Sequence, residues 1–571
     1  MAYTTIDDPT KFFNTIIYTG DGSTKTISGV GFQADLVWGK GRNSNSAHLL
    51  TDSVRGATKT LYSNATSAEV TSSTASLTGF TSDGYTVDSA SNYNVNSRTQ
   101  VNWNWLAGGT APAITYTVKV VSDSGNKYRF NDFGTSAVTL DLQEGGTYTF
   151  DQSDSSNSGH PLRFSTTSNG THGGGSEYTT GVTVTGTPGN SGAKTVITVA
   201  ASAPTLYYYC TQHSAMGGQA NTNSTFGSSN FSGTTQANVS ANTTAGFSIV
   251  SYTGTGSNAT VGHGLGVKPD WIINKTRDTT AQMWSVYHSS RGATKHLGLD
   301  RVNAEDTGSA YYQDTEPTSS VFSVGSEAAT NYSSAAFIAY CFAEKKGYSK
   351  FGSYTGNGST NGAFAYTGFK PAFVMIKTNT DSGEWAMFDN KRNIGNETAD
   401  VLRANSNSAE SDSTGNNSID ILSNGFKVKG TGGWVGTNGR GFIYMAFAES
   451  PFVNSNGVPT NARWPMMKPL IIGAIIAAIL IWFLNGLMDS AMAETNTVSS
   501  TVVTNNTPPT ANAPSVVVNN SDVCKTAASV GVQTQILGIA SGITVTDENC
   551  ERIKLSRSLY AMGMKVAAIS T

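Results

Sequence analysis

Short runs of apolar residues, separated by Gly, Asn and Asp turns, make up most of the first 460 residues. Three of them, DLVWGK, DWIINK and AFVMIK, span residues 35–40, 270–275 and 372–377, and each ends in a lysine. Alternation of apolar and polar residues with a period of two is the signature of a strand with one buried face. The pattern predicts an all-β protein built from antiparallel β-sandwiches.

Three copies of one unit, each of about a hundred residues, frame the chain. Tyr-Thr-Gly begins at Tyr18, Tyr252 and Tyr354, and the pentapeptide RGATK occurs identically at residues 55–59 and 291–295. A unit of this length can bury a core of its own, so separate sandwiches are favoured over a solenoid. We therefore expect three tandem sandwich repeats, at residues 1–112, 246–346 and 347–463.

A different kind of segment separates the first two repeats. Residues 113–220 contain eight short strand-like runs, from YTVKVVS to LYYYC, which is enough for one complete sandwich. Residues 221–245 then lose all periodicity in a run of Asn, Ser, Thr and Gly. This composition predicts a flexible linker.

The segment LYYYCTQHSAMGG places Cys210, His213 and Met216 at successive intervals of three residues, after a predicted strand. A mononuclear type-1 copper ion takes one Cys and two His ligands in a plane and a weak Met ligand on its axis. The second imidazole must come from another segment. His160 in SGHPLRF is the candidate, with His172 in NGTHGGG as the alternative. The sequence predicts a copper site, against the simpler interpretation that the Cys and Met only fill a core.

The motif Tyr-Cys-x-x-His-x-x-Met at residues 209–216, with Gly-His-Pro upstream, resembles the type-1 copper loop of cupredoxins. Its spacing is closest to the amicyanin type, and the resemblance covers roughly residues 113–220. The resemblance implies a cupredoxin-like sandwich with the copper ligands His160, Cys210, His213 and Met216. One departure is Pro161, which stands where cupredoxins often have Asn and has no backbone N–H to donate. How the Cys sulfur is supported by its surroundings is therefore left open.

The repeats resemble a second group of proteins. The order YTG, GF-x-P-D-x-V-x-x-K, S-x-RGATK and SDGF, closed by an apolar strand, is similar to tandem domains in structural and tail-fibre-like proteins of marine, cyanophage-type tailed phages. The similarity covers residues 13–110 and 245–463. It implies jelly-roll or lectin-like sandwiches in a virion tail or surface protein, which we expect to be a homo-oligomer. Its expected partners are other virion proteins and a glycan or protein of the host surface.

The RGATK turns supply further candidate ligand-binding residues, namely Arg55, Lys59, Arg291 and Lys295. Their alternative role is to anchor the turns, because RGATK lacks the glycine framework of a phosphate loop. Loops rich in Asn and Asp are compatible with sugar binding, with or without calcium.

Composition and charge exclude some classes of function. A net charge of -3 and a pI near 6.2 give no basic surface, so we expect no nucleic-acid partner. The motifs of serine hydrolases, P-loop enzymes and zinc proteases do not occur, and we expect no enzymatic activity. Of the four cysteines, Cys341 lies in an apolar run that predicts a buried thiol, while Cys524 and Cys550 are close enough in sequence to pair in an oxidising compartment.

The C-terminal part has a different character. Residues 469–488 form a stretch of 20 residues without a charge, long enough to span a bilayer. Together with Lys468 and the Ala-Met-Ala at residues 491–493, the stretch also has the pattern of a signal peptide, as if a second reading frame began at about Met466. We expect a hydrophobic helix over 464–493. Over 494–571 we expect a disordered stretch and then two helical pieces, which begin at Cys524 and Cys550. A genuine anchor would favour the alternative function, an envelope-anchored blue-copper electron-transfer protein.

Overall fold

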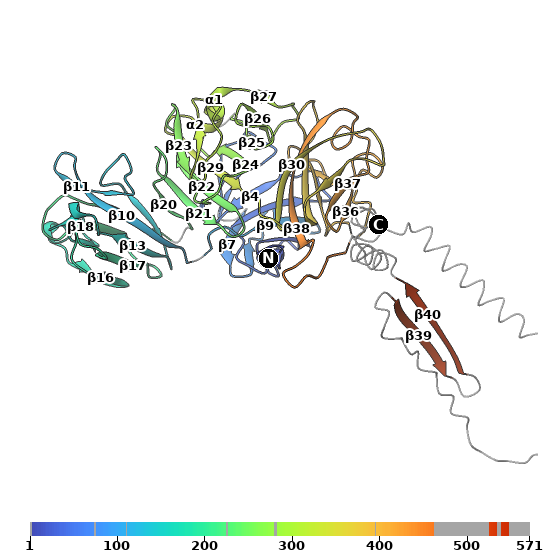
Figure 1. Ribbon diagram of the computed structural model, residues 1–571, viewed down its shortest axis with the longest axis horizontal. Helices are drawn as coiled ribbons and strands as arrows, with labels where there is room; N and C mark the ends of the chain where they lie inside the picture. The colour runs from blue at the N-terminus through green and yellow to red at the C-terminus, as the bar shows by residue number, and fades with distance from the viewer. Residues whose placement is uncertain are drawn as a thin grey trace, which may run out of the picture. The chain divides into compact units, whose positions relative to one another are not determined.

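A computed structural model describes residues 3–72, 76–109, 111–223, 226–278, 282–393, 395–461, 525–533 and 538–546. The chain divides into two compact units, Met1–Pro469 and Leu470–Thr571. The first unit is almost entirely β, as the sequence predicts (Figure 1). The helices among its described residues are single turns: η1 (Pro9–Lys11), η2 (Ser155–Asn157), η3 (Gly170–Gly173), α1 (Ser309–Tyr312) and α2 (Ala328–Asn331).

Each repeat contains a larger and a smaller antiparallel sheet. In repeat 1 the larger sheet has the order β1 (Phe13–Thr19), β9 (Thr99–Trp105), β3 (Leu36–Gly41) and β4 (Leu49–Asp52). The smaller sheet consists of β2 (Lys25–Ile27), β8 (Gly84–Val87) and β7 (Leu77–Thr81), and a short ribbon of β5 (Lys59–Thr60) and β6 (Val70–Thr71) follows β4. The two sheets enclose a core of their own, which includes Val37 and Tyr85.

Repeats 2 and 3 reproduce this strand order. The larger sheet of repeat 2 contains β22 (Phe247–Thr253), β29 (Ala336–Phe342), β24 (Trp271–Thr276), β25 (Ser285–His288), β26 (Lys295–Gly298) and β27 (Asp306–Thr307), and its smaller sheet β23 (Ala259–Gly262) and β28 (Val321–Val324). In repeat 3 they are β30 (Ser349–Thr355), β38 (Gly441–Pro451), β32 (Phe369–Thr378), β33 (Ala386–Asp389), β34 (Asp400–Arg403) and β35 (Ser411–Asp412), with β31 (Phe364–Tyr366), β37 (Gly425–Val428) and β36 (Ile419–Leu422). The predicted threefold repetition is therefore present in the strand order.

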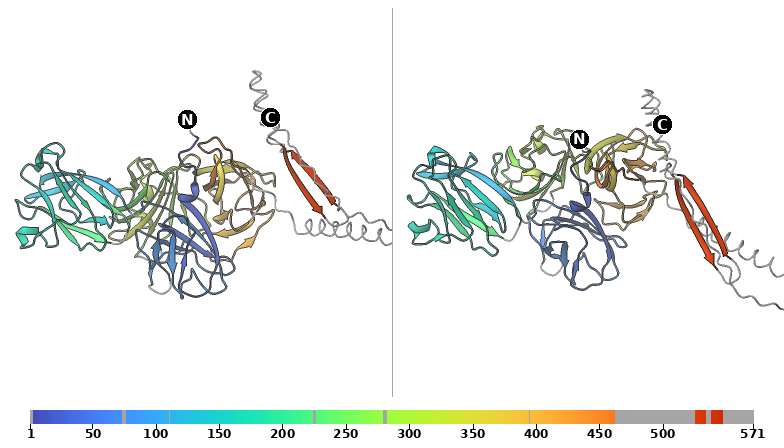
Figure 2. Two further views of the ribbon diagram at one scale, coloured as in Figure 1. Left: turned by 90° about the horizontal axis from the view of Figure 1, so that it is seen from below. Right: turned by 60° about the horizontal axis from the view of Figure 1, so that its bottom comes forward.

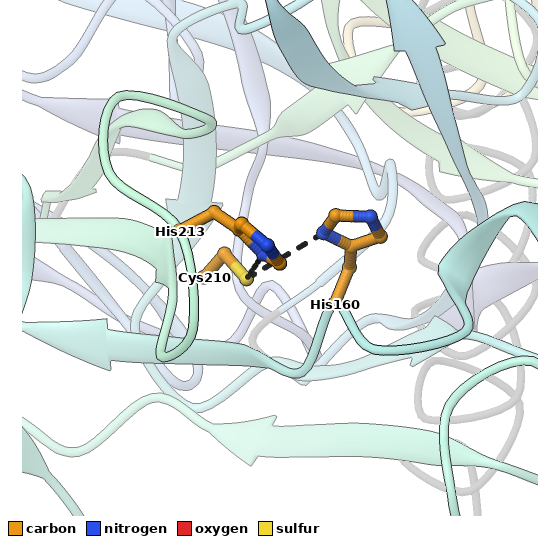
Figure 3. A group of neighbouring side chains, drawn as sticks. All are labelled: His160, Cys210 and His213. Carbon is orange, nitrogen blue, oxygen red and sulfur yellow. Dashed lines mark hydrogen bonds between the residues drawn. The ribbon is translucent and has the colours of Figure 1, made fainter.

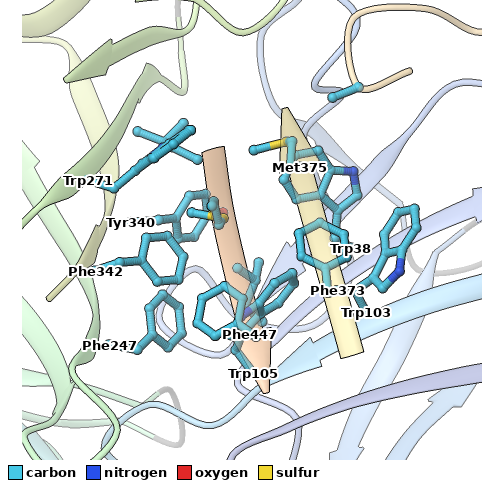
Figure 4. Packing of buried hydrophobic residues seen from close by; sticks show 14 of the residues in the cluster. Trp38, Trp103, Trp105, Phe247, Trp271, Tyr340, Phe342, Phe373, Met375 and Phe447 are labelled. Atoms are coloured by element: carbon cyan, nitrogen blue, oxygen red, sulfur yellow. The ribbon is translucent and has the colours of Figure 1, made fainter. Parts of the chain in front are cut away.

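The three larger sheets also share one core, which the sequence did not predict. Trp105, Phe342 and Phe447 are equivalent by strand register, because they pair with Leu36, Trp271 and Phe373. The centres of their three rings lie 6.4, 5.8 and 5.6 Å apart, so they form a triangle in which every repeat contacts the other two (Figure 4). Figure 2 shows the repeats as three lobes grouped around this centre.

Polar contacts between repeats form a closed ring around the shared core. An equivalent glutamate of each repeat accepts hydrogen bonds from a side chain of the next repeat, and its own main-chain N–H donates to the carbonyl of that same residue. The three pairs are Arg277–Glu69 at 3.0 Å, Asn379–Glu305 at 3.2 Å and Arg42–Glu410 at 2.6 Å. Because the contacts run from repeat 2 to 1, from 3 to 2 and from 1 to 3, the arrangement is cyclic.

The lysines that end the three recurring runs belong to the same ring. Lys40, Lys275 and Lys377 are completely buried, and each ammonium group donates to a main-chain carbonyl of a neighbouring repeat. These acceptors are Asn407 at 3.3 Å, Thr66 at 3.3 Å and Val302 at 2.9 Å. Burial lowers the pKa of Lys40 and Lys275 to about 8 and that of Lys377 to about 7.

Residues 113–223 form a separate two-sheet module. One sheet has the order β11 (Asn126–Phe130), β10 (Ala113–Ser122), β13 (Thr147–Asp151), β17 (Lys194–Thr198) and β16 (Val182–Thr185). The other consists of β12 (Leu140–Gln143), β19 (Gly218–Asn223), β18 (Leu206–Cys210), β14 (Leu162–Ser165) and β15 (Glu177–Tyr178). Residues of both sheets, such as Tyr116 and Leu162, share one core, so the sheets pack face to face.

The segment 221–245, predicted to be a flexible linker, contains strands, and that prediction is wrong. After β19, the chain forms β20 (Ser228–Asn230) and β21 (Ala237–Asn242), and β21 pairs with β22 along the edge of repeat 2. Phe231 enters the core of the two-sheet module. Pairing with a neighbouring strand overrides the weak strand propensity of Asn, Ser and Gly. The module is therefore joined to repeat 2 by a paired strand and not by a flexible linker.

In the second unit, Lys525–Gln533 (β39) and Gly538–Thr546 (β40) form an antiparallel pair. The expected helix near residue 524 is thus a strand, in agreement with the alternation in SVGVQ at residues 529–533. The predicted hydrophobic helix 464–493, the second predicted helical piece, Cys524 and Cys550 lie outside the described residues. Within the described ranges, no helix is long and apolar enough to cross a membrane. Cys341 is buried as a free thiol, as predicted.

Replacing Trp105 by Ala should destabilise all three repeats together. The change removes one corner of the aromatic triangle and should lower the free energy of unfolding by about 3–5 kcal/mol. Calorimetry should show one cooperative transition of the three repeats, and this whole transition should move to lower temperature. Ile17→Ala, which truncates an exposed side chain of the same repeat, is the control. A loss of repeat 1 alone, with the other two repeats melting as before, would contradict a shared core.

Lys377 should make the stability depend on pH. Since its folded pKa of about 7 lies below the ordinary value near 10.5, the unfolded chain binds more protons between these values, and stability rises with pH there. One such group contributes at most about 1.4 kcal/mol per pH unit. Chemical denaturation measures the free energy of unfolding of the wild type and of Lys377→Met. Between pH 7 and 10, we expect this free energy to rise in the wild type relative to the variant. If the difference between the two free energies does not change with pH, the prediction that buried Lys377 loses its proton in this range is refuted.

Candidate metal centre

Two neighbouring strands bring the predicted ligands to one end of a sheet. In the antiparallel pair β14 and β18, Leu162 lies opposite Cys210. His160 precedes β14 by two residues, and His213 follows β18 by three. Because the start of one strand meets the end of the other, both histidines reach the same end of the sheet as the thiol.

The three side chains converge on one point (Figure 3). The Sγ atom of Cys210 lies 3.9 Å from Nδ1 of His160 and 3.7 Å from Nδ1 of His213, and one ligand atom from each residue lies within 4.8 Å of the others. In the part of the chain that the structure describes, this is the one group of three or more His, Cys, Asp or Glu side chains close enough to share a metal ion. The group contains no carboxylate, whereas calcium is bound by carboxylate and other oxygen ligands.

The surroundings of the three ligands differ. Cys210 is completely buried, His160 is half-buried and His213 is exposed. Burial, and then the neighbouring His213, lower the pKa of His160 below its ordinary value. A neutral imidazole is the form that binds a metal, so the site favours the state that coordination requires.

The loop that carries His213 and Met216 is held by close packing. Met216 is buried in the core of the module, and its carbonyl accepts a hydrogen bond of 3.0 Å from the N–H of Tyr128. At Gly217, a Cβ atom would lie only 1.7 Å from the carbonyl oxygen of Tyr208. Only glycine fits there, which explains why the loop ends in Gly-Gly.

Gln152 supports the segment around Pro161, and the sequence did not reveal this role. The Gln152 side chain donates to the carbonyl of His160 at 2.9 Å and accepts from the N–H of Leu162 at 3.1 Å. The carbonyl of Pro161 accepts from the N–H of Thr211, next to Cys210, at 3.2 Å. These bonds hold both sides of a proline that cannot donate, and tie its segment to the cysteine strand.

The alternative histidine, His172, lies outside the ligand group. Its Nε2 atom is 3.1 Å from the carbonyl oxygen of Cys210, and its side chain is exposed. The group close enough to share an ion therefore contains His160 and not His172.

Three of the four RGATK candidates pair with residues of their own repeat. Arg55 forms ion pairs with Asp52 and Glu69, and Arg291 forms one with Glu305. Lys295 donates to Thr307 at 2.6 Å. The fourth candidate, Lys59, lines a cleft of about 590 Å³ with Arg277 and Asp141.

Over the described residues, the fold and the ligand group define a mostly β, multi-sheet protein with a potential metal centre of two imidazoles and a thiol. The chain belongs to the family described as Domain of unknown function (DUF7483), whose model matches residues 8–145 and 219–451. The match leaves out residues 146–218, which contain all four predicted copper ligands. No curated protein and no solved structure matches the chain.

Gly217→Ala should distort the loop even without a metal. The added methyl group would overlap the Tyr208 carbonyl, so we expect a loss of at least about 2 kcal/mol in the free energy of unfolding. Gly134→Ala is a matched control in the same module, because a Cβ there meets no atom within 4 Å. Thermal unfolding of the metal-free variants measures both effects. Equal stability of the two variants would contradict the close packing at Gly217.

Proposed function

We propose that residues 113–220 form a cupredoxin-like module that binds one copper ion in a type-1 site. His160, His213 and Cys210 would supply the ligands in the plane, and Met216 the axial sulfur. The observation that carries the proposal is the convergence of two imidazole nitrogens and one thiol sulfur within 4.8 Å. A soft thiolate with two imidazoles and a nearby thioether is the ligand set that copper prefers.

The distances are compatible with one shared ion. Metal–sulfur and metal–nitrogen bonds of about 2.3 and 2.05 Å place the sulfur and nitrogen ligands of one ion about 3.6 to 3.8 Å apart. The two distances from Sγ of Cys210 are 3.9 and 3.7 Å. Zinc seldom takes a thioether, so Met216 in the same loop favours copper.

The residues around the centre suit the exchange of single electrons, which is the chemistry that a bound copper ion supplies. Cys210 is shielded from water inside the sandwich, while His213 is exposed at the surface. Gln152 and Gly217 hold the two ligand-bearing segments in place. A rigid ligand set limits rearrangement between oxidation states, and the exposed imidazole provides an edge at which a redox partner could dock.

We further propose that the whole chain is a virion structural protein of the tail-fibre type. Its three repeats would present loops to a glycan or protein of the host surface, and would also contact other virion proteins. The rigid ring of repeats supports this function, since copies held at fixed positions bind a repetitive surface with high effective concentration. A homo-oligomer would add to the avidity.

Copper titration of the full chain tests the metal function. We expect one copper ion per chain and an intense visible absorption from sulfur-to-copper charge transfer. Cys210→Ser should abolish this band, because the serine oxygen cannot replace the thiolate. The control, Cys341→Ala, removes the buried free thiol of repeat 2 and should leave the band intact. A protein that takes up no copper, or a Cys210→Ser variant with an unchanged spectrum, would rule out the proposal.

Mass spectrometry of purified virions and of host membrane fractions tests the location. The virion function predicts peptides from residues 3–461 in the particles. Peptides found in membranes and absent from particles would favour the envelope-anchored electron-transfer protein instead.

A further inference from the structure

Tyr128 lies in the core of the module, on the sheet opposite the one that carries the ligands. It belongs to β11 and is completely buried, and its ring centre lies 6.4 Å from that of Tyr208. Its main-chain carbonyl accepts a hydrogen bond of 2.8 Å from Ala137. Backbone and ring are therefore both fixed, so the hydroxyl group has a defined position.

This one residue is bonded to the segments of two predicted ligands. Its N–H donates to the carbonyl of Met216 at 3.0 Å, and its hydroxyl donates to the carbonyl of His160 at 2.9 Å. Tyr128 therefore links the two segments that carry these ligands.

Other buried tyrosines of the module show that the arrangement is specific to this position. Tyr116 donates to the carbonyl of Ser229 at 2.8 Å, and Tyr208 donates to that of Val138 at 2.6 Å. Neither acceptor belongs to a predicted ligand. A general need to satisfy buried hydroxyl groups therefore explains these two tyrosines, but not why Tyr128 is directed at the ligand group.

We propose that Tyr128 is the positioning residue of the metal centre, which fixes the His160 and Met216 segments through its hydroxyl group and its main-chain N–H. The inference rests on the proposed copper function and goes beyond it. The bond to the His160 carbonyl acts beside that of Gln152, and the two bonds hold the backbone that carries the imidazole.

The test is Tyr128→Phe in the full chain, which removes only the hydroxyl oxygen. We expect the variant still to bind one copper ion, with a dissociation constant for Cu(I) about 10- to 100-fold higher. Its metal-free form should unfold at the same temperature as that of Tyr116→Phe, so that the loss of affinity reports on the position of the ligands and not on the stability of the fold.

Tyr116→Phe is the matched control, because it removes a buried hydroxyl bonded to a carbonyl away from the ligands, and it should keep the wild-type affinity for Cu(I). If Tyr128→Phe does not fold, 3-fluorotyrosine placed at position 128 alone keeps the shape, donates more strongly and should bind Cu(I) more tightly. An unchanged affinity of the Tyr128 variant, beside a wild type that binds copper, would overturn this inference alone. A wild type that binds no copper would overturn the proposed function and this inference together.

Discussion

The contact among Trp105, Phe342 and Phe447 is the constraint on which the rest of the structure depends. One ring from each repeat meets at the centre of the body, so no repeat can bury its larger sheet without the other two. The cyclic glutamate pairs and the buried lysines surround this apolar centre and fix which repeat follows which. Three copies of a sandwich sequence thus become a single closed body.

The packing of the repeats also supports the candidate metal centre, because the segment after the module belongs to both. Strand β21 extends the larger sheet of repeat 2, and the adjoining Phe231 completes the core of the two-sheet module. On that base, the pairing of β14 with β18 places His160, Cys210 and His213 at one end of a sheet. The fold thereby brings together three side chains that could hold a metal ion, which is the preorganisation that such a site requires.

The sequence predicted the features that depend on local pattern, namely the strands, the repeats and the convergence of His160 with the cysteine loop. It did not predict the shared core, because runs such as DLVWGK were interpreted as strands with one buried face, whereas the strand Leu36–Gly41 is buried on both faces. The prediction of a flexible linker at residues 221–245 was wrong for a related reason, because the strands of this segment depend on the neighbouring strands with which they pair. Gln152 and Tyr128 are single polar residues far from the ligand loop in sequence, and only the fold brings them to it.

The central claim is that one soft ion lies between one sulfur and two imidazoles of a preformed site. X-ray absorption at the copper edge of the loaded protein measures this most directly, because it reports the number and type of atoms bound to the ion. The account predicts one short sulfur bond and two imidazole nitrogens, with the short sulfur bond absent from Cys210→Ser. A spectrum that contains only nitrogen and oxygen ligands would contradict it.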